Sequence, residues 1–185
     1  MTILSFKDKT PKISEDCFIA ENSTVIGDVE MNSHSSLWFG TVIRGDVFHI
    51  RIGQNTNIQD NSVVHVTANR FPTLIGNNVT VGHSVTLHGC VVNDNVLIGI
   101  GSIVMDQCRI GEWSILAAGS VVKPRTNIPS GKLWGGIPSK EIRDINDKEK
   151  EWIKELSNNY VRLSKDYLES SNFHIRQLNK QKGVE

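Results

Sequence analysis

The sequence has no surplus of charge of either sign and no long hydrophobic run. Its 185 residues contain 20 Lys and Arg against 20 Asp and Glu, so the formal net charge is zero. Nucleic-acid binders and polybasic membrane modules need excess positive charge, and we expect neither kind of partner. No apolar stretch approaches the roughly 18 residues of a membrane-spanning helix. Residues 1–14 also lack the continuous apolar core of a secretion signal.

Cysteine is scarce. The chain contains only Cys17, Cys90 and Cys108, without a C-x-x-C pair. An odd number without such spacing indicates reduced thiols in a cytoplasmic protein rather than a disulfide framework. The length fits one domain with an appendage, and a charged fraction of 22% is that of a globular chain.

What the sequence does contain is an internal period of six residues. Ile, Val, Leu or Met recurs at every sixth position in four runs within residues 13–122, and Gly often follows such an anchor. The residue four places after an anchor is usually small or β-branched, as at Ser35, Val47 and Val91. Each hexad is therefore predicted to form a short strand and a tight corner, with two side chains that point inward. The anchors are Ile13, Ile19, Val25, Met31, Leu37, Ile43, Ile52, Ile58, Val64, Ile75, Val81, Leu87, Val92, Ile98, Val104, Ile110, Leu116 and Val122.

Three hexads make one triangular coil, so eighteen anchors predict about six coils of parallel β-helix over residues 1–125. A sandwich of short strands is the alternative, but sandwiches do not keep a fixed hexad over such a length. Gaps in the period predict two loops, at 47–51 and 66–74, and the second should project from the coil.

After the coils the pattern changes. Prolines suggest an irregular connection at 126–146, and apolar residues then recur at spacings of three and four, which predicts a helix over 147–170. Asn146 or Asp147 is the expected N-cap. The polar tail, 171–185, is expected to be disordered. The expected apolar face of the helix is Trp152, Leu156, Tyr160, Leu163 and Tyr167.

Three histidines stand out once the coil sides are numbered. His65 and His88 each follow an anchor of the same side, in adjacent coils. Adjacent strands lie about 4.8 Å apart, so two such imidazoles can converge on one zinc ion. His83 lies at the end of a different side, where a threefold-related neighbour can bring it to the same ion. We therefore predict a homotrimer with three shared metal sites, the plain alternative being surface histidines.

An arginine and a carboxylate occupy the same positions on the coil as these histidines. Arg44 directly follows an anchor, as His65 does on the same side, and Asp60 lies two residues after an anchor, as His83 does on its side. A neighbour that brings His83 to the metal should therefore bring Asp60 to Arg44, and Asp46 is close enough to join them. An ion pair that fixes the trimer is at least as well supported for these residues as a catalytic role.

At this point the motifs resemble a known family. Ile43-Arg44-Gly45-Asp46, Asn57-Ile58-Gln59-Asp60, Val64-His65 and the stretch 82–90 are together similar to the gamma-class carbonic anhydrases and their bacterial relatives. The resemblance covers about residues 1–170. It implies a left-handed β-helix and a homotrimer that hydrates CO2 reversibly to bicarbonate. It also implies zinc, or in some members iron or cobalt, at the subunit interface.

The resemblance also implies roles for single residues. The metal ligands would be His65, His83 and His88. The residues near the metal-bound water and CO2 would be Gln59 and Asn57, and Arg44 is a further candidate catalytic residue. The supporting interface network would be Arg44, Asp46 and Asp60, and Tyr160 is matched loosely to a helix tyrosine near the site.

The proton-export residues of the most active relatives are missing. Those relatives carry one glutamate just after the aspartate of R-x-D and another in the projecting loop. This chain has Val47 at the first position and no carboxylate in 66–74. His34 and His49 are the candidate substitutes, and slow turnover or none is expected if neither serves.

Two other functions stay open at this stage. One is a hexapeptide acyltransferase that uses an acyl-CoA donor, since such enzymes share the coil. They typically use one histidine as a general base and have no need for three at an interface. The other is a metal-containing trimeric scaffold without turnover, which a CO2 hydration assay would distinguish from an enzyme.

Overall fold

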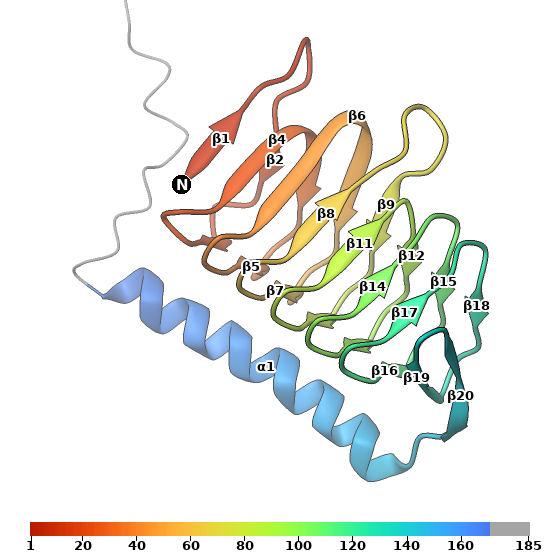
Figure 1. The fold of residues 1–185 in the computed structure, drawn as a ribbon. Helices are drawn as coiled ribbons and strands as arrows, with labels where there is room; N and C mark the ends of the chain where they lie inside the picture. Colours follow the sequence, from red (N-terminus) through yellow and green to blue (C-terminus); the bar gives the residue numbers. More distant parts are fainter. Residues whose placement is uncertain (171–185) are drawn as a thin grey trace, which may run out of the picture.

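The computed structural model describes residues 1–170, and the predicted tail at 171–185 lies outside the described residues. Short strands stack into a left-handed parallel β-helix of about seven turns, with one α-helix lying along its side (Figure 1). The predicted fold class is therefore confirmed. Within residues 1–170, no helix is long and apolar enough to cross a membrane.

The coil has three faces, named here by what they carry. The histidine face consists of β1 (Thr2–Leu4), the first parts of β4 (Thr24–Met31) and β6 (Val42–Ile52), β8 (Val63–His65), β11 (Thr86–His88), β14 (Ile103–Val104) and β17 (Val121–Val122). The open face consists of β2 (Lys12–Ile13), the later parts of β4 and β6, β9 (Thr73–Ile75), β12 (Val91–Val92), β15 (Arg109–Ile110) and β18 (Asn127–Ile128).

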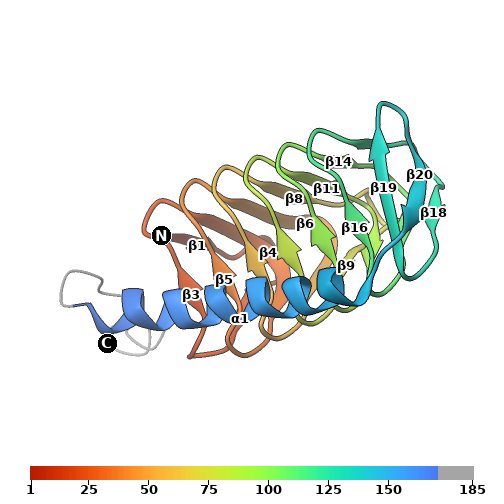
Figure 2. The same ribbon diagram turned by 90° about the horizontal axis from the view of Figure 1, so that it is seen from below.

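The third face, the helix face, lies under α1 (Asp147–Glu169), as Figure 2 shows. It consists of β3 (Phe18–Ile19), β5 (Ser36–Leu37), β7 (Asn57–Ile58), β10 (Thr80–Val81), β13 (Leu97–Ile98), β16 (Ile115–Leu116), β19 (Lys132–Gly136) and β20 (Ser139–Asp144). Every strand pair of the three faces is parallel except β19–β20, which is antiparallel.

The six-residue period fills the interior. All the predicted anchors are buried except Ile13, which is half-buried against the same core. Most of the small residues four places later are buried as well, and Val47 and Val91 are the exceptions. At Val91 the turn between Leu87 and Val92 is one residue shorter, so Cys90 takes the inward place.

At Val47 the expected inward position is wrong. Gly45 pairs with Gly27 but Ile50 pairs with Val29, so β6 carries a bulge between the two paired positions. The extra residues leave the regular coil, and Val47 is 37% exposed. A charged side chain at this position would therefore meet solvent rather than the core.

The segment 126–146 is not irregular, contrary to the sequence prediction. Ile128 and Trp134 continue the hexad from Val122, and strands β18 to β20 lie in this segment. Pro124 and Pro129 lie just after strands β17 and β18, outside the strands themselves, and the coil continues past both of them. The coil is therefore longer than the six turns expected.

The helix begins at a capping box, in which the Glu149 backbone N–H donates to the Asn146 side chain and the Asn146 backbone N–H donates to the Glu149 carboxylate. Its buried face centres on Ile153, Ser157 and Ser164, and the Ser157 hydroxyl donates to the Asn55 carbonyl at 2.8 Å. Small serines let the helix approach the coil corners closely. Of the residues expected on the packed face, Trp152 and Leu163 are exposed. Leu156, Tyr160 and Tyr167 are partly buried against the coil.

Candidate metal centre

His65 and His88 lie one above the other on the histidine face. β8 and β11 are paired in register so that His65 opposes His88, and the ring centroids are 5.2 Å apart. Nδ1 of His65 lies 3.2 Å from Nε2 of His88. The predicted stacking of these two residues is confirmed, while their role as ligands stays a prediction.

The spacing of the two nitrogens fits a shared zinc ion. Nitrogens bound at about 2.0–2.1 Å in tetrahedral geometry lie roughly 3.3–3.4 Å from each other. The observed separation of 3.2 Å is close to that nitrogen–nitrogen distance. Burial lowers the pKa of His65, with Asp46 offsetting this in part, which favours the neutral imidazole that a metal requires.

Each candidate ligand has its other ring nitrogen on a carboxylate. His65 Nε2 lies 3.1 Å from Asp46, and His83 Nδ1 lies 2.8 Å from Asp60. His88 Nδ1 lies 2.7 Å from Asp106. Carboxylates placed in this way fix the tautomer and orientation of metal-binding histidines. The nitrogens that face away from these carboxylates are Nδ1 of His65 and Nε2 of both His83 and His88.

His83 does not join the other two histidines within one chain. It follows β10 at the corner of the helix face, directly above Asp60, which follows β7 in the adjacent coil. Among residues 1–170, no three His, Cys, Asp or Glu side chains converge as a metal site. The described chain thus carries two separate parts of the predicted ligand set.

The histidine-face part of the site includes Arg44. Its guanidinium lies 2.6 Å from Asp46, the carboxylate that also contacts His65. Burial would raise the pKa of Asp46, but the hydrogen bonds from Arg44 and His65 lower it on balance. Within the chain Arg44 therefore pairs with Asp46 and Asp60 pairs with His83, and the predicted Arg44–Asp60 contact between subunits stays a prediction.

The other part of the site includes two buried amides. Gln59 Nε2 donates to Asn57 Oδ1 at 3.1 Å, and Asn57 Nδ2 donates to Thr80 Oγ1 at 2.9 Å. Gln59 also lines a largely apolar hollow of about 470 Å³ between α1 and the helix face, together with Tyr160. The pKa of Tyr160 is raised by burial and also by the charge of Asp60, so this tyrosine lies on the His83 side of the site.

The two candidate proton carriers lie in different places. His49 lines a hollow of about 400 Å³ together with Asp46 and Val47, and its ring packs against Phe48 at 4.4 Å. Burial lowers the pKa of His49, as does the nearby Arg51, while Asp28 and Glu30 raise it. His34 instead pairs with Asp16 at 3.1 Å and does not line this hollow.

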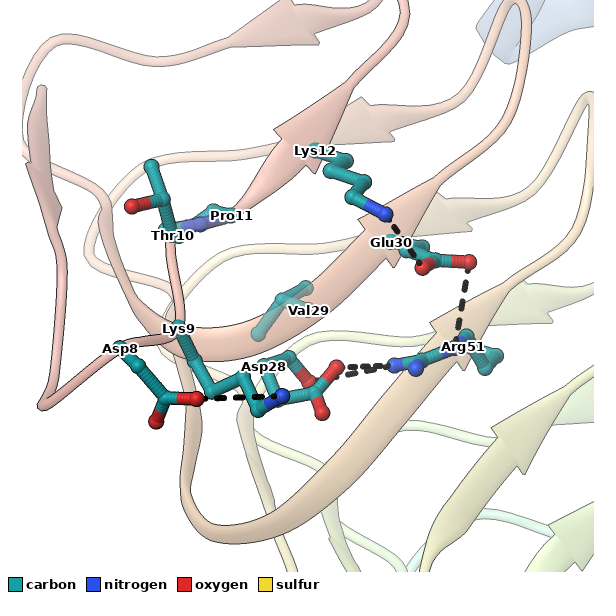
Figure 3. A pocket seen from close by; sticks show the side chains of 9 residues that line it. All are labelled: Asp8, Lys9, Thr10, Pro11, Lys12, Asp28, Val29, Glu30 and Arg51. Carbon is teal, nitrogen blue, oxygen red and sulfur yellow. Dashed lines mark hydrogen bonds and ion pairs between the residues drawn. The ribbon is translucent and has the colours of Figure 1, made fainter.

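A neighbouring hollow of about 440 Å³ lies beside the N-terminal coils (Figure 3). Arg51 lies 2.8 Å from Asp28 and 3.2 Å from Glu30, and Lys12 lies 3.6 Å from the same glutamate. Lys9 pairs with Asp8. Every cation that lines this hollow has a carboxylate partner, so it is a solvated ion-pair network.

Comparisons with known proteins agree with the motifs. Residues 89–124 match the family model "Bacterial transferase hexapeptide (six repeats)". A carbonic anhydrase of Geobacillus kaustophilus is 41% identical over 93% of this chain and 90% of its own length. The chain belongs to the gamma carbonic anhydrase family.

Two further relatives extend the comparison. Gamma carbonic anhydrase 2 of Arabidopsis thaliana, a mitochondrial protein, is 42% identical over 96% of the chain, which spans about two thirds (66%) of that protein. A crystal structure of a hexapeptide transferase family protein from Anaplasma phagocytophilum is 42% identical, with a TM-score of 0.86 over 90% of this chain and 98% of that one. Gamma carbonic anhydrase homologues imply a metal cofactor and an oligomer.

The sequence interpretation missed Asp106 and Thr67. Thr67 Oγ1 donates to Asp106 Oδ1 at 2.9 Å, and that oxygen also contacts His88. One signal was available, since Asp106 lies two places after the anchor Val104, one coil beyond His88 on the same face. No signal in the hexads pointed to Thr67, because it lies in the projecting loop.

Proposed function

We propose that this protein catalyses the reversible hydration of CO2 to bicarbonate at metal sites shared between subunits of a homotrimer. The observation that carries the proposal is the His65–His88 pair, whose facing nitrogens lie 3.2 Å apart and whose outer nitrogens each contact a carboxylate. His83 Nε2 of a neighbouring subunit would complete the ligand set, with zinc as the proposed metal and iron or cobalt as alternatives.

The histidine face supports the homotrimer. Its outward side chains form a ladder in register across β6, β8, β11, β14 and β17, and two of them are exposed apolar residues. Val63 and Ile103 are each 39% exposed beside the candidate ligands. A second copy covering this face would bury that ladder and place its own helix-face corner, which carries His83, against His65 and His88. The ladder consists of Val42, Val63, Thr86, Ile103 and Val121.

The residues divide the chemistry between them. A divalent metal held by these histidines would lower the pKa of a bound water to about 7 and so would supply a nucleophile at neutral pH. Asn57 accepts a hydrogen bond from the Gln59 amide, whose carbonyl oxygen and second N–H would orient that nucleophile towards CO2. Arg44 holds Asp46, and Asp46 in turn holds His65.

The two alternatives are less well supported. A hexapeptide acyltransferase would share the coil, but the curated relatives that span most of this chain and of their own length include carbonic anhydrases. A non-catalytic scaffold would retain metal and trimer with hydration at background. A hydration assay on the metal-loaded trimer, paired with its metal content, tests the proposal, and background hydration at full loading would refute it.

A cytoplasmic location is part of the same proposal. Cys17, Cys90 and Cys108 are buried free thiols, and burial raises the pKa of Cys17 to about 12. Thiols in this state are unreactive and suit a reducing compartment.

The proton-export step gives a prediction for turnover. Among residues 1–170, Val47 lines the hollow beside Asp46 and no glutamate does, so exogenous base should carry the proton. High imidazole buffer should raise kcat severalfold and leave kcat/KM for CO2 unchanged, because base acts only after bicarbonate has formed. Sodium chloride at matched ionic strength is the control.

Val47→Glu should raise kcat at low buffer in the same way, because position 47 is exposed in the bulge. Fast hydration whose kcat does not change with buffer concentration would show that a residue of the chain already carries the proton. His49 is the first candidate.

A further inference from the structure

Both ring nitrogens of His88 have a partner in the structure. Its Nε2 faces His65, and its Nδ1 lies 2.7 Å from Asp106 Oδ1. Asp106 follows β14 in the next coil, so it belongs to a different turn from either histidine. With Nδ1–H donated to the carboxylate, the lone pair of Nε2 is directed towards His65.

Asp106 is itself held in place. Thr67 Oγ1 donates to the same carboxylate oxygen at 2.9 Å. Thr67 lies in the projecting loop, where its backbone exchanges hydrogen bonds with Phe71 at 3.0 and 3.2 Å. The Thr67 hydroxyl group therefore ties the loop to the carboxylate that contacts His88.

The missing side chain of Gly89 leaves space for the Asp106 carboxylate beside His88. Gly89 has a positive φ of 56°, and a methyl group there would lie 2.3 Å from Asp106 Oδ1 and 3.0 Å from Cβ of Phe71. Any larger residue would displace the carboxylate from His88. A hydrogen bond from the Gly89 N–H to Thr73 Oγ1, at 2.9 Å, fixes the backbone just after the histidine.

We propose that Asp106 is a positioning residue for His88, and that Thr67 orients Asp106 so that the projecting loop tunes metal affinity. The inference rests on the proposed function in taking His88 as a metal ligand. Carboxylates that hold metal-binding histidines typically contribute 10–100-fold to affinity, and Asp106 is placed to do the same here.

The test measures Zn²⁺ affinity by chelator competition. Asp106→Ala should weaken binding by about 10–100-fold, Asp106→Asn by less, and Thr67→Val by several-fold. The matched control is Asp94→Ala. Asp94 also accepts hydrogen bonds at a coil corner, from the Asn77 backbone at 2.8 Å and side chain at 3.1 Å, but it contacts no histidine within residues 1–170. Affinities for Asp106→Ala and Asp106→Asn within twofold of that control would overturn the proposal.

A second readout needs no metal. Long-range ¹H–¹⁵N correlation spectra of the metal-free protein should show His88 protonated on Nδ1, and Asp106→Ala should shift it towards the Nε2–H tautomer. An unchanged tautomer would contradict the positioning role. If the wild-type protein binds no Zn²⁺, the proposed function fails, and the tautomer still decides the role of Asp106. Because Asp106→Asn and Thr67→Val change little volume, a folding failure of the alanine variant does not remove the test.

Discussion

Replacing His65, His83 or His88 with alanine should abolish stoichiometric metal binding and CO2 hydration, while the β-helix stays folded. A catalytic zinc site with three protein ligands loses its geometry when one of them is removed. The coil should tolerate each change, because its core consists of the buried hexad anchors and these side chains lie outside it. Metal per chain by mass spectrometry and circular dichroism measure the two outcomes.

His34→Ala is the control for these three variants. His34 is a half-exposed histidine whose ring contacts only Asp16 among the ion pairs of the described chain. It should keep a full complement of metal. Retention of one metal per chain in any of the other three variants would refute the ligand set.

Arg44→Ala should weaken the trimer strongly. The proposed neighbour places Asp60 against Arg44, and truncating one partner of a buried, hydrogen-bonded ion pair costs about 2–5 kcal/mol. That corresponds to roughly 30- to 5,000-fold in the dissociation constant. The change also removes the 2.6 Å contact with Asp46, which holds His65, so metal affinity should fall as well. Sedimentation velocity over a concentration series measures the association.

Arg51→Ala is the matched control for Arg44→Ala. Arg51 also pairs with carboxylates, Asp28 and Glu30, but it lies on the open face. The trimer should keep its stability in this variant. If Arg44→Ala gave an equally stable trimer with normal metal, Arg44 would instead be assigned to binding an anion.

The period of six made most of the fold predictable from the sequence. An inward side chain at every sixth position marks one side of a coil, and with three sides to a coil the anchors also indicate which polar residues share a face. His65 and His88 could be placed together for that reason. The hand of the coil could not be derived from this periodicity, and it came only with the family resemblance.

The errors came from local departures from that period. The bulge after Gly45 turned Val47 outward, and the short turn after Leu87 gave the inward place to Cys90. Prolines at corners looked like the end of the coil, although strands β18 and β19 continue it past Pro124 and Pro129. The contact between Thr67 and Asp106 depends on how one loop folds, which a repeat pattern does not determine.

The central claim is that each metal site takes His65 and His88 from one subunit and His83 from another. Mixing His83→Ala and His65→Ala chains while unfolded, then refolding them at equal concentrations, tests it most directly. Each mixed trimer would contain one intact interface, so random assembly should recover about a quarter of the wild-type metal content. A mixture of His65→Ala and His88→Ala should recover none, because both lack the same half of the site. Recovery near one quarter in the first mixture alone is the predicted result. With refolded wild-type protein fully loaded, no recovery in the first mixture would contradict a site shared between subunits.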